Sequence, residues 1–251
     1  MSYLSFSNQG LDKLIDICKS TPKFTEETYK KNQVKRGLRD ENGAGVITGL
    51  TDISDVIAKK NDIPIYATRQ SAVKFSCDSP VRAHLCERDI LFSEDIGDMH
   101  ISSFQTSHDS LMSVGYRIEY SDDDGLHSIG YATDTGYISD GIRTALLGCD
   151  AVVLECNHDV DMLMRGPYPY DLKRRVASCR GHLSNNDCAD FSLDLVQNGT
   201  RAILLAHVSR ENNDPTIAFD TVSNAISGFN VNLAIAEPFA PTELVIPKKE
   251  D

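Results

Sequence analysis

The sequence predicts an α/β protein, and two observations carry that prediction. Short apolar runs, each long enough for one buried strand, alternate with helix-like segments through the second half of the chain. Before them, from about residue 63, the pattern is rich in strand-like segments. The 251 residues include 41% hydrophobic and 25% charged residues, which is typical of a globular protein with a real core. We therefore expect one α/β domain over residues 1–251.

The β-rich part begins with two short apolar runs, residues 63–67 and 90–92. Residues 112–120 then alternate between apolar and polar side chains, as a half-buried strand does. Residues 128–132 follow across the turn at residues 122–125. Together these segments predict a β-hairpin or a β-meander.

The second half predicts helices and buried strands in alternation. Their order is helix 137–147, strand 151–154, helix 184–199, strand 202–205, helix 216–226 and strand 231–235. Ser184 is a suitable N-cap for the second helix, and Gly199 is a suitable stop. The first 50 residues are divergent, with a helix-like polar segment at residues 25–33 and no strong strand signal.

Composition excludes several classes of protein. Lys and Arg number 25 and Asp and Glu number 37, so the net charge is −12, which excludes a globally basic nucleic-acid coat but not a local basic patch. No apolar run approaches the ~20 residues of a membrane span, and the first residues lack a secretion signal, so we expect a cytoplasmic protein with no membrane partner. The seven cysteines form no C-x-x-C pair, which favours reduced thiols over disulfides.

Polar groups follow the buried strands at the points where we expect those strands to end. His207 follows one strand, the run from Glu155 to His158 follows another, and Asp134 follows a third. In α/β folds ligands collect at the carboxyl ends of strands, and His with Asp suits zinc or manganese. Each residue also has an ordinary reading, because His207 can hydrogen-bond a loop and Asp134 can form a turn.

Two further histidines stand in patterned surroundings. His108 precedes the predicted strand at residues 112–120. His182 lies just before the helix that Ser184 begins, where backbone N–H groups favour an anion.

A basic segment over residues 165–175 interrupts the acidic sequence. It contains Arg165, Lys173, Arg174 and two tyrosines, one of them Tyr168. Basic groups match phosphate and tyrosine rings can stack on bases, so the segment is either a nucleic-acid contact or a solvated helix face.

Five motifs resemble one known family when they are taken in order. They are S-H-D-S with V-G-Y-R-I, then Y-A-T-D-T-G-Y, L-E-C-N-H-D with R-G-P-Y-P-Y-D-L-K-R-R, G-H-L-S-N, and L-L-A-H-V-S-R-E-N-N. The chain resembles the metallo-β-lactamase-fold hydrolases of the WalJ/YycJ type, which are relatives of tRNase Z. The resemblance covers residues 63–226 and implies an αββα four-layer sandwich with a di-metal phosphodiesterase site.

The resemblance also implies roles for single residues. His108, Asp134 and His207 match metal ligands, and His182 matches the residue that transfers a proton to the leaving oxygen. His158 is a second catalytic candidate in the same cleft. The substrate would be DNA or RNA, bound by the residues Arg165, Tyr168, Lys173, Arg174, Asn185 and Asn212.

One family signature is lost from this sequence. The family has T-H-x-H-x-D-H just upstream of P-I-Y-A-T, and here Thr48 is followed by Gly49, Thr51, Ile53 and Ser54 at the ligand positions. None of these side chains replaces imidazole as a zinc ligand. The three matched ligands would hold one zinc or manganese ion, or would bind metal only weakly. Three hypotheses follow: an impaired or single-metal hydrolase, a pseudoenzyme that binds nucleic acid or protein, and a scaffold whose histidines are structural.

Overall fold

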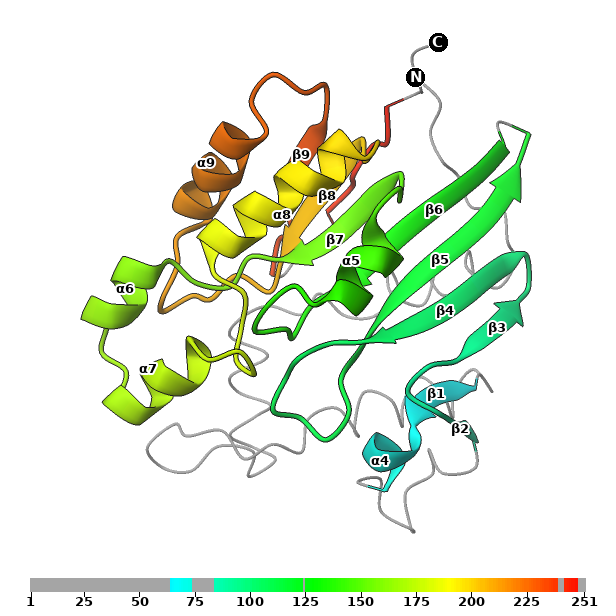
Figure 1. Cartoon of the computed structure of the whole chain (residues 1–251), viewed down its shortest axis with the longest axis horizontal. Coiled ribbons are helices and arrows are strands. Elements are labelled where there is room, and N and C mark those ends of the chain that lie inside the picture. Colours follow the sequence, from blue (N-terminus) through cyan, green and yellow to red (C-terminus); the bar gives the residue numbers. More distant parts are fainter. Residues whose placement is uncertain (1–63, 74–83, 124, 239–241, 248–251) are drawn as a thin grey trace, which may run out of the picture. The chain divides into compact units, whose positions relative to one another are not determined.

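The computed structural model describes residues 64–73, 84–123, 125–238 and 242–247 (Figure 1). The described residues divide into two compact units, with the boundary in the sequence between Asp89 and Ile90. The prediction of one domain over residues 1–251 includes residues outside these ranges and stays a prediction. So does the helix-like segment at residues 25–33.

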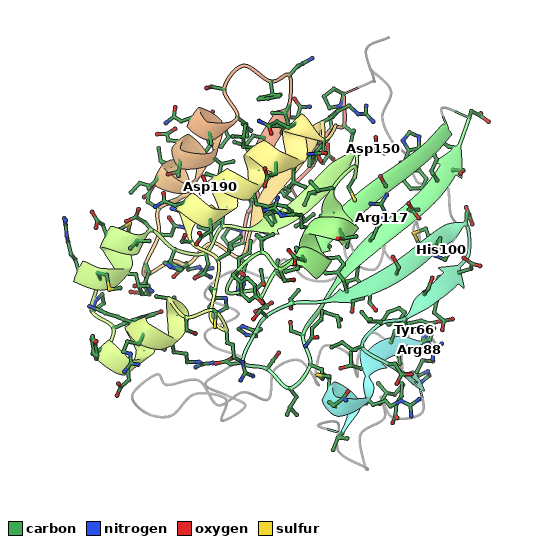
Figure 2. The ribbon with its side chains drawn as sticks, viewed as in Figure 1. Tyr66, Arg88, His100, Arg117, Asp150 and Asp190 are labelled. Carbon is green, nitrogen blue, oxygen red and sulfur yellow. The ribbon has the colours of Figure 1, made fainter. Side chains whose placement is uncertain are left out.

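The smaller unit contains a pair of parallel strands and one turn of helix. They are β1 (Ile65–Thr68), α4 (Arg69–Ala72) and β2 (Leu85–Arg88). The guanidinium of Arg88 lies over the ring of Tyr66, 4.9 Å from its centroid, and this cation–π contact joins the two strands (Figure 2).

The larger unit contains a seven-stranded mixed sheet in the order β3-β4-β5-β6-β7-β8-β9 (Figure 1). Neighbours from β3 to β6 are antiparallel, and neighbours from β6 to β9 are parallel. The strands are β3 (Ser93–Ile96), β4 (Met99–Gln105), β5 (Val114–Asp122), β6 (Gly125–Ala132), β7 (Ala151–Glu155), β8 (Ala202–Ala206) and β9 (Asn232–Ile235). The predicted hairpin is confirmed as β5 and β6, in which Asp122 pairs with Gly125.

The predicted strand at residues 90–92 is wrong. The side chain of Ser103 accepts from the N–H of Phe92 and donates to the carbonyl of Ile90, while the Ser103 N–H donates to the Phe92 carbonyl at 2.9 Å. The hydroxyl therefore replaces one of the two backbone bonds of a regular strand pair. Strand β4 was not predicted from the sequence, because serines interrupt its apolar pattern.

Helices α5, α8 and α9 cover one face of the sheet, and α6 and α7 lie beyond the edge at which β7 ends (Figure 1). The helices are α5 (Asp140–Leu146), α6 (Val160–Arg165), α7 (Tyr170–Val176), α8 (Asn185–Gln197) and α9 (Pro215–Ala225). The core lies between the sheet and the covering helices, where Leu154 and Ile203 of the strands meet Phe191 and Val222 of the helices. Strands β7 and β8 are apolar except for Glu155 at the end of β7, because they are buried on both faces.

The predicted start and end of the longest described helix are confirmed. The hydroxyl of Ser184 accepts from the N–H of Asp187, which satisfies one of the donors exposed at the start of α8. Gly199 has φ +97°, a conformation that glycine adopts without steric cost, and it ends the helix.

A buried ion pair fixes the ends of the parallel strands opposite to the candidate site (Figure 2). Asp150, just before β7, lies 2.7 Å from the guanidinium of Arg201, just before β8. The second carboxylate oxygen of Asp150 accepts from the N–H of Ser128 in β6. One carboxylate therefore holds three strands in register at the end where they begin.

Candidate metal centre

Three neighbouring parallel strands deliver polar residues to one edge of the sheet. In the register of the sheet, Ala132 of β6 pairs with Leu154 of β7, and Glu155 of β7 pairs with Ala206 of β8. Asp134, Glu155 and His207 stand at or just beyond these strand ends. Parallel pairing therefore brings residues that are far apart in the sequence to the same place.

Two loops add a histidine each. His108 lies in the loop between β4 and β5, and His182 lies between α7 and α8. The ring centroids of His108 and His182 are 5.0 Å apart, and those of His182 and His207 are 4.9 Å apart. The three imidazoles thus form one cluster at the edge of the sheet.

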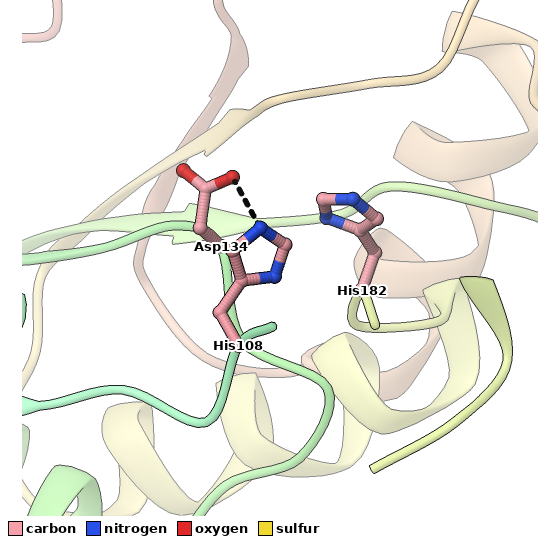
Figure 3. A group of neighbouring side chains, drawn as sticks. All are labelled: His108, Asp134 and His182. Carbon is pink, nitrogen blue, oxygen red and sulfur yellow. Dashed lines mark ion pairs between the residues drawn. The ribbon is translucent and has the colours of Figure 1, made fainter. Parts of the chain in front are cut away.

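The ligand-type atoms form two overlapping groups that share His182. His108, Asp134 and His182 form the first group (Figure 3), and Glu155, His182 and His207 form the second, with the atoms of each group within 4.8 Å of one another. Nε2 of His108 lies 3.6 Å from Oδ1 of Asp134, and Nδ1 of His207 lies 3.7 Å from the same oxygen. Asp134 therefore stands between the two predicted histidine ligands.

Hydrogen bonds fix which ring nitrogen carries the proton. Nδ1 of His108 lies 3.0 Å from the carbonyl oxygen of Gly181, and a carbonyl oxygen only accepts, so Nδ1 donates. Nδ1 of His182 and Nδ1 of His207 each lie 2.7 Å from Oε1 of Glu155, and they donate to that carboxylate. In the neutral rings the lone pair then belongs to Nε2. Fixing the second nitrogen in this way is typical of histidines that bind metals.

Glu155 is fully buried and accepts hydrogen bonds from several members of the cluster. Oε1 accepts from His182 and His207, and Oε2 accepts from the N–H of Thr135 at 2.8 Å. One carboxylate thus joins the loops that carry Asp134, His182 and His207. Sequence reasoning placed Glu155 at a strand end but gave it no role, and a carboxylate that ends a buried apolar strand was the available signal.

The histidines control the ionisation of this buried acid. Burial by itself raises the pKa of Glu155, but the hydrogen bonds and charges of His182 and His207 outweigh burial and hold that pKa below its usual value. The same hydrogen bond raises the pKa of His207 against the opposing effect of burial. The cluster is therefore built around an ionised carboxylate.

Asp134 and His207 also have an unusual backbone conformation. Both have φ +56°, and in the described ranges they are the two residues other than glycine with positive φ. Such backbone costs energy for residues with a Cβ atom and concentrates at functional sites. Asn157 supports the turn at His207, because its side-chain amide donates to the His207 carbonyl at 2.8 Å.

The cluster opens into a cleft of about 350 Å³. His108, His182 and His207 lie on its floor side, and α7 contributes Leu172 and Arg175. Arg175 forms an ion pair with Asp109, the neighbour of His108, and this pair lowers the pKa of Asp109. The structure thus adds Asp109 to the residues that sequence reasoning selected, and it places Arg175 of the predicted basic segment in the cleft.

The residues predicted to bind substrate fall into different surroundings. Tyr168 and Asn212 line the cleft. Asn185 is 2% exposed and exchanges side-chain hydrogen bonds with Asn213, so it supports the cleft from behind. Arg165 pairs with Asp161 on the surface of α6, and Lys173 donates to the carbonyl of Met164.

His158 lies behind the cleft and is 2% exposed. Its backbone pairs with that of Ser184, and its Nδ1 is buried with no hydrogen-bond partner among the described residues. Burial lowers the pKa of His158, which favours the neutral ring. It does not belong to the described wall of the cleft, and its catalytic role stays a prediction. Residues 48–54, where the family signature is lost, lie outside the described residues.

The chain is similar to known proteins over most of its length. Residues 47–207 match the family model described as the beta-lactamase superfamily domain. The chain is 31% identical over 236 residues to exodeoxyribonuclease YycJ of Bacillus anthracis, an alignment that covers 88% of this chain and 86% of that protein. It is 36% identical over 143 residues to exodeoxyribonuclease WalJ of Streptococcus pneumoniae, with 57% of this chain and 52% of that protein covered.

Two solved structures share the fold. One is the metallo-beta-lactamase fold protein YhfI of Bacillus subtilis, with a TM-score of 0.53, 16% identity, and 78% and 73% of the two chains covered. The other is Zn²⁺-bound PqqB of Methylobacterium extorquens, with a TM-score of 0.54, 13% identity, and 86% and 80% covered. These likenesses confirm the predicted metallo-β-lactamase fold. No helix within the described ranges is long and apolar enough to cross a membrane.

Proposed function

The chain belongs to the β-lactamase superfamily, and from that premise we propose that it is a metal-dependent phosphodiesterase that cleaves DNA at the cleft formed by His108, His182 and His207. The observation that carries the proposal is the pair of ligand groups joined at His182, in a cleft that Arg175 also lines. The names of the relatives, exodeoxyribonucleases in both cases, support DNA as the substrate.

The residues present fit a metal ion. We assign zinc or manganese to His108, Asp134 and His207: His108 and Asp134 belong to one ligand group and His207 to the other, and the bond from His108 to Gly181 leaves Nε2 of His108 to bind. Bound there, the ion would polarise a phosphoryl oxygen and activate water. These three ligands are enough for one catalytic ion with an open position.

His182 is the proposed proton donor to the leaving oxygen. Its Nδ1–H donates to Glu155, which orients the ring, so the proton that it would transfer is the one that the imidazolium form carries on Nε2.

Arg175 and Tyr168 would receive the substrate inside the cleft. The guanidinium of Arg175 already binds the Asp109 carboxylate, and a DNA phosphodiester likewise offers two oxygens that share one negative charge. Arg165, Lys173 and Arg174 lie outward along the same segment and would add phosphate contacts that carry no sequence information.

The test is hydrolysis of a single-stranded DNA oligonucleotide labelled at one end, with the chelated protein and after addition of zinc or manganese. We expect cleavage only with metal, and elemental analysis should find one ion per chain. The hydrolase would be overturned if the protein bound neither zinc nor manganese, or if neither ion restored cleavage. DNA binding that survives chelation with no cleavage after metal is restored would instead establish the pseudoenzyme, the alternative that the substitutions at residues 48–54 favour.

A further inference from the structure

Asn157 lies where three segments of the candidate site meet. It lines the cleft, two residues after the end of β7, and is 7% exposed. Its N–H donates to the carbonyl of Leu183, the residue after His182, at 2.9 Å. Its carbonyl accepts from the N–H of Ser209, two residues after His207, at 2.8 Å. The backbone of Asn157 therefore joins the segment that carries His182 to the loop that carries His207.

Backbone hydrogen bonds hold this loop on both sides of His207. Before it, the carbonyl of Ala206 accepts from the N–H of Cys156 at 3.0 Å. After it, the N–H of Ser209 donates to Asn157. The loop is thus attached to the end of β7 without help from any side chain, and the residue between the two attachments is His207 itself.

The side chain of Asn157 acts on that one residue. Its amide donates to the His207 carbonyl at 2.8 Å, and His207 has φ +56°. A residue with a Cβ atom keeps this backbone conformation only when its surroundings hold it there. Because the direction of the carbonyl is set by the backbone torsion of His207, a bond to the carbonyl opposes relaxation of the strained residue.

The ring of His207 has a separate attachment. Its Nδ1 donates to Oε1 of Glu155, 2.7 Å away at the end of the same strand β7. One hydrogen bond to one ring atom leaves the ring free to pivot about that bond. The bond from Asn157 fixes the backbone from which the ring extends, so the two attachments together define one direction of the imidazole.

We propose that Asn157 is a positioning residue for the metal centre, which acts through the His207 carbonyl to fix the direction of the His207 imidazole. The inference rests on the proposed function, in which His207 is a metal ligand. Partners that orient a metal ligand without touching the ion commonly contribute to metal affinity. The side chain of Asn157 should therefore contribute to metal binding in addition to stability.

The experiment measures the binding of zinc and of cobalt to the full chain by calorimetry, with no DNA present. We expect Asn157→Ala to weaken binding by about 10- to 100-fold, the usual effect of losing a partner that orients a metal ligand. Asn157→Leu keeps a side chain of similar shape but has no donor, so it should weaken binding as well. The visible spectrum of bound cobalt, which depends on the geometry of its ligands, should change in both variants.

Thr200→Val is the matched control. Thr200 is 3% exposed, and its hydroxyl donates to the Cys149 carbonyl at 2.8 Å, just before β7 and β8 begin and so at the end of these strands opposite to the cleft. This variant also loses one buried hydrogen bond to a carbonyl. Urea denaturation of the metal-free proteins should show similar losses of stability for Thr200→Val and Asn157→Ala. Zinc affinity and the cobalt spectrum should change only in the Asn157 variants.

The positioning role is overturned if either Asn157 variant binds zinc like the parent. It is also overturned if Thr200→Val weakens zinc binding equally, because a general loss of stability would then explain the effect. A parent that binds zinc but cleaves no DNA with zinc or manganese loses the hydrolase and leaves the role of Asn157 to be decided by the variants' zinc affinities. A parent that binds no metal overturns both proposals.

Discussion

Oε1 of the buried Glu155 lies 2.7 Å from Nδ1 of His207, a histidine whose backbone has φ +56°. The carboxylate sits at the end of β7 and the histidine just beyond β8, so the register of two parallel strands sets their distance. The same oxygen holds His182. A single buried acid therefore fixes the direction of two imidazoles that the family resemblance assigns to metal binding and proton transfer.

Removing this acid should destabilise the fold as well as the site. Glu155→Ala leaves the Thr135 N–H and two imidazole N–H groups without their acceptor, and we expect a loss of about 3 to 5 kcal/mol in the free energy of unfolding. Urea denaturation of the metal-free protein measures it. Glu155→Gln keeps the volume but places an amide N–H against one of these donors, so it should also destabilise, by about 1 to 3 kcal/mol.

Glu119→Gln provides the comparison, because Glu119 pairs with Arg117 near the surface. It should change the free energy of unfolding by about 0 to 1 kcal/mol. Equal effects of the substitutions at Glu119 and Glu155 would mean that the buried carboxylate does not organise the loops.

His182→Ala should separate proton transfer from metal binding. We expect the variant to retain its metal ion and to lose about 10²- to 10⁴-fold in the rate of DNA cleavage, which is the usual contribution of a general acid. An ester with a p-nitrophenolate leaving group needs no proton, so its hydrolysis should fall much less. Elemental analysis and the two rates are the measurements.

Because His182 belongs to both ligand groups, this test decides whether it binds metal or transfers a proton. A variant that loses its metal would make His182 a ligand. A variant that slows both substrates equally would remove it from proton transfer.

Much of the site could be predicted because parallel strands place their ends together. The buried runs at residues 151–154 and 202–205 are hard to mistake for surface segments, and polar residues directly after them must meet at one edge. That reasoning selected Asp134 and His207; the sequence pattern also singled out His108 and His182, and the resemblance gave all four their roles. The observed helix at Ser184 follows from a local cap, which a sequence also carries.

The rest depends on contacts that spacing does not encode. Nothing local says that Glu155 is buried among three donors, or that Asn185 faces Asn213 instead of the cleft. The basic segment reads as one patch, but Arg174 and Arg175 are neighbours on α7 and lie about 100° apart around the helix, so Arg175 lines the cleft and Arg174 does not. Which side of the helix faces the cleft is decided by tertiary packing.

Gly136 should tolerate no side chain. A Cβ atom there would lie 2.4 Å from the Cys179 carbonyl carbon, and the Gly136 N–H donates to the Ser107 carbonyl at 2.8 Å, so this glycine packs between the loops that carry His108 and His182. We expect Gly136→Ala to cost about 1 to 3 kcal/mol in the free energy of unfolding and to weaken zinc binding, measured by calorimetry.

Gly141→Ala is the control for this substitution. It lies in α5, where the nearest atom to an added Cβ is 3.7 Å away, and alanine favours helix. Its stability should equal or exceed that of the parent. A Gly136→Ala protein with parental stability and zinc affinity would contradict the close packing of the two loops.

Tyr120 should make stability fall at alkaline pH. Burial, and then the charges of Asp122 and Asp150, raise the pKa of Tyr120 to about 12. An unfolded tyrosine has a pKa of about 10, so the folded state binds the proton more tightly. This stabilisation is complete below about pH 10 and is lost as the pH rises from about 10 to about 12. Denaturation of the parent and of Tyr120→Phe at pH 8 to 11 measures it, and the variant should show the smaller decline; identical declines would contradict the shift.

Binding of DNA by the basic segment should depend steeply on salt. Each neutralised phosphate of a single strand releases counterions and contributes about 0.7 log units of affinity per tenfold change in salt. Lys173→Ala combined with Arg174→Ala removes two charges on α7, so the slope should flatten by about 1.4. The titration is run in chelator with the parent, the double variant and Arg69→Ala, which removes a cation paired with Asp89 in the smaller unit. A double variant with the parental slope, or a parent that binds no DNA at low salt, would exclude the segment from nucleic-acid binding, because phosphate contacts by these residues cannot form without releasing counterions.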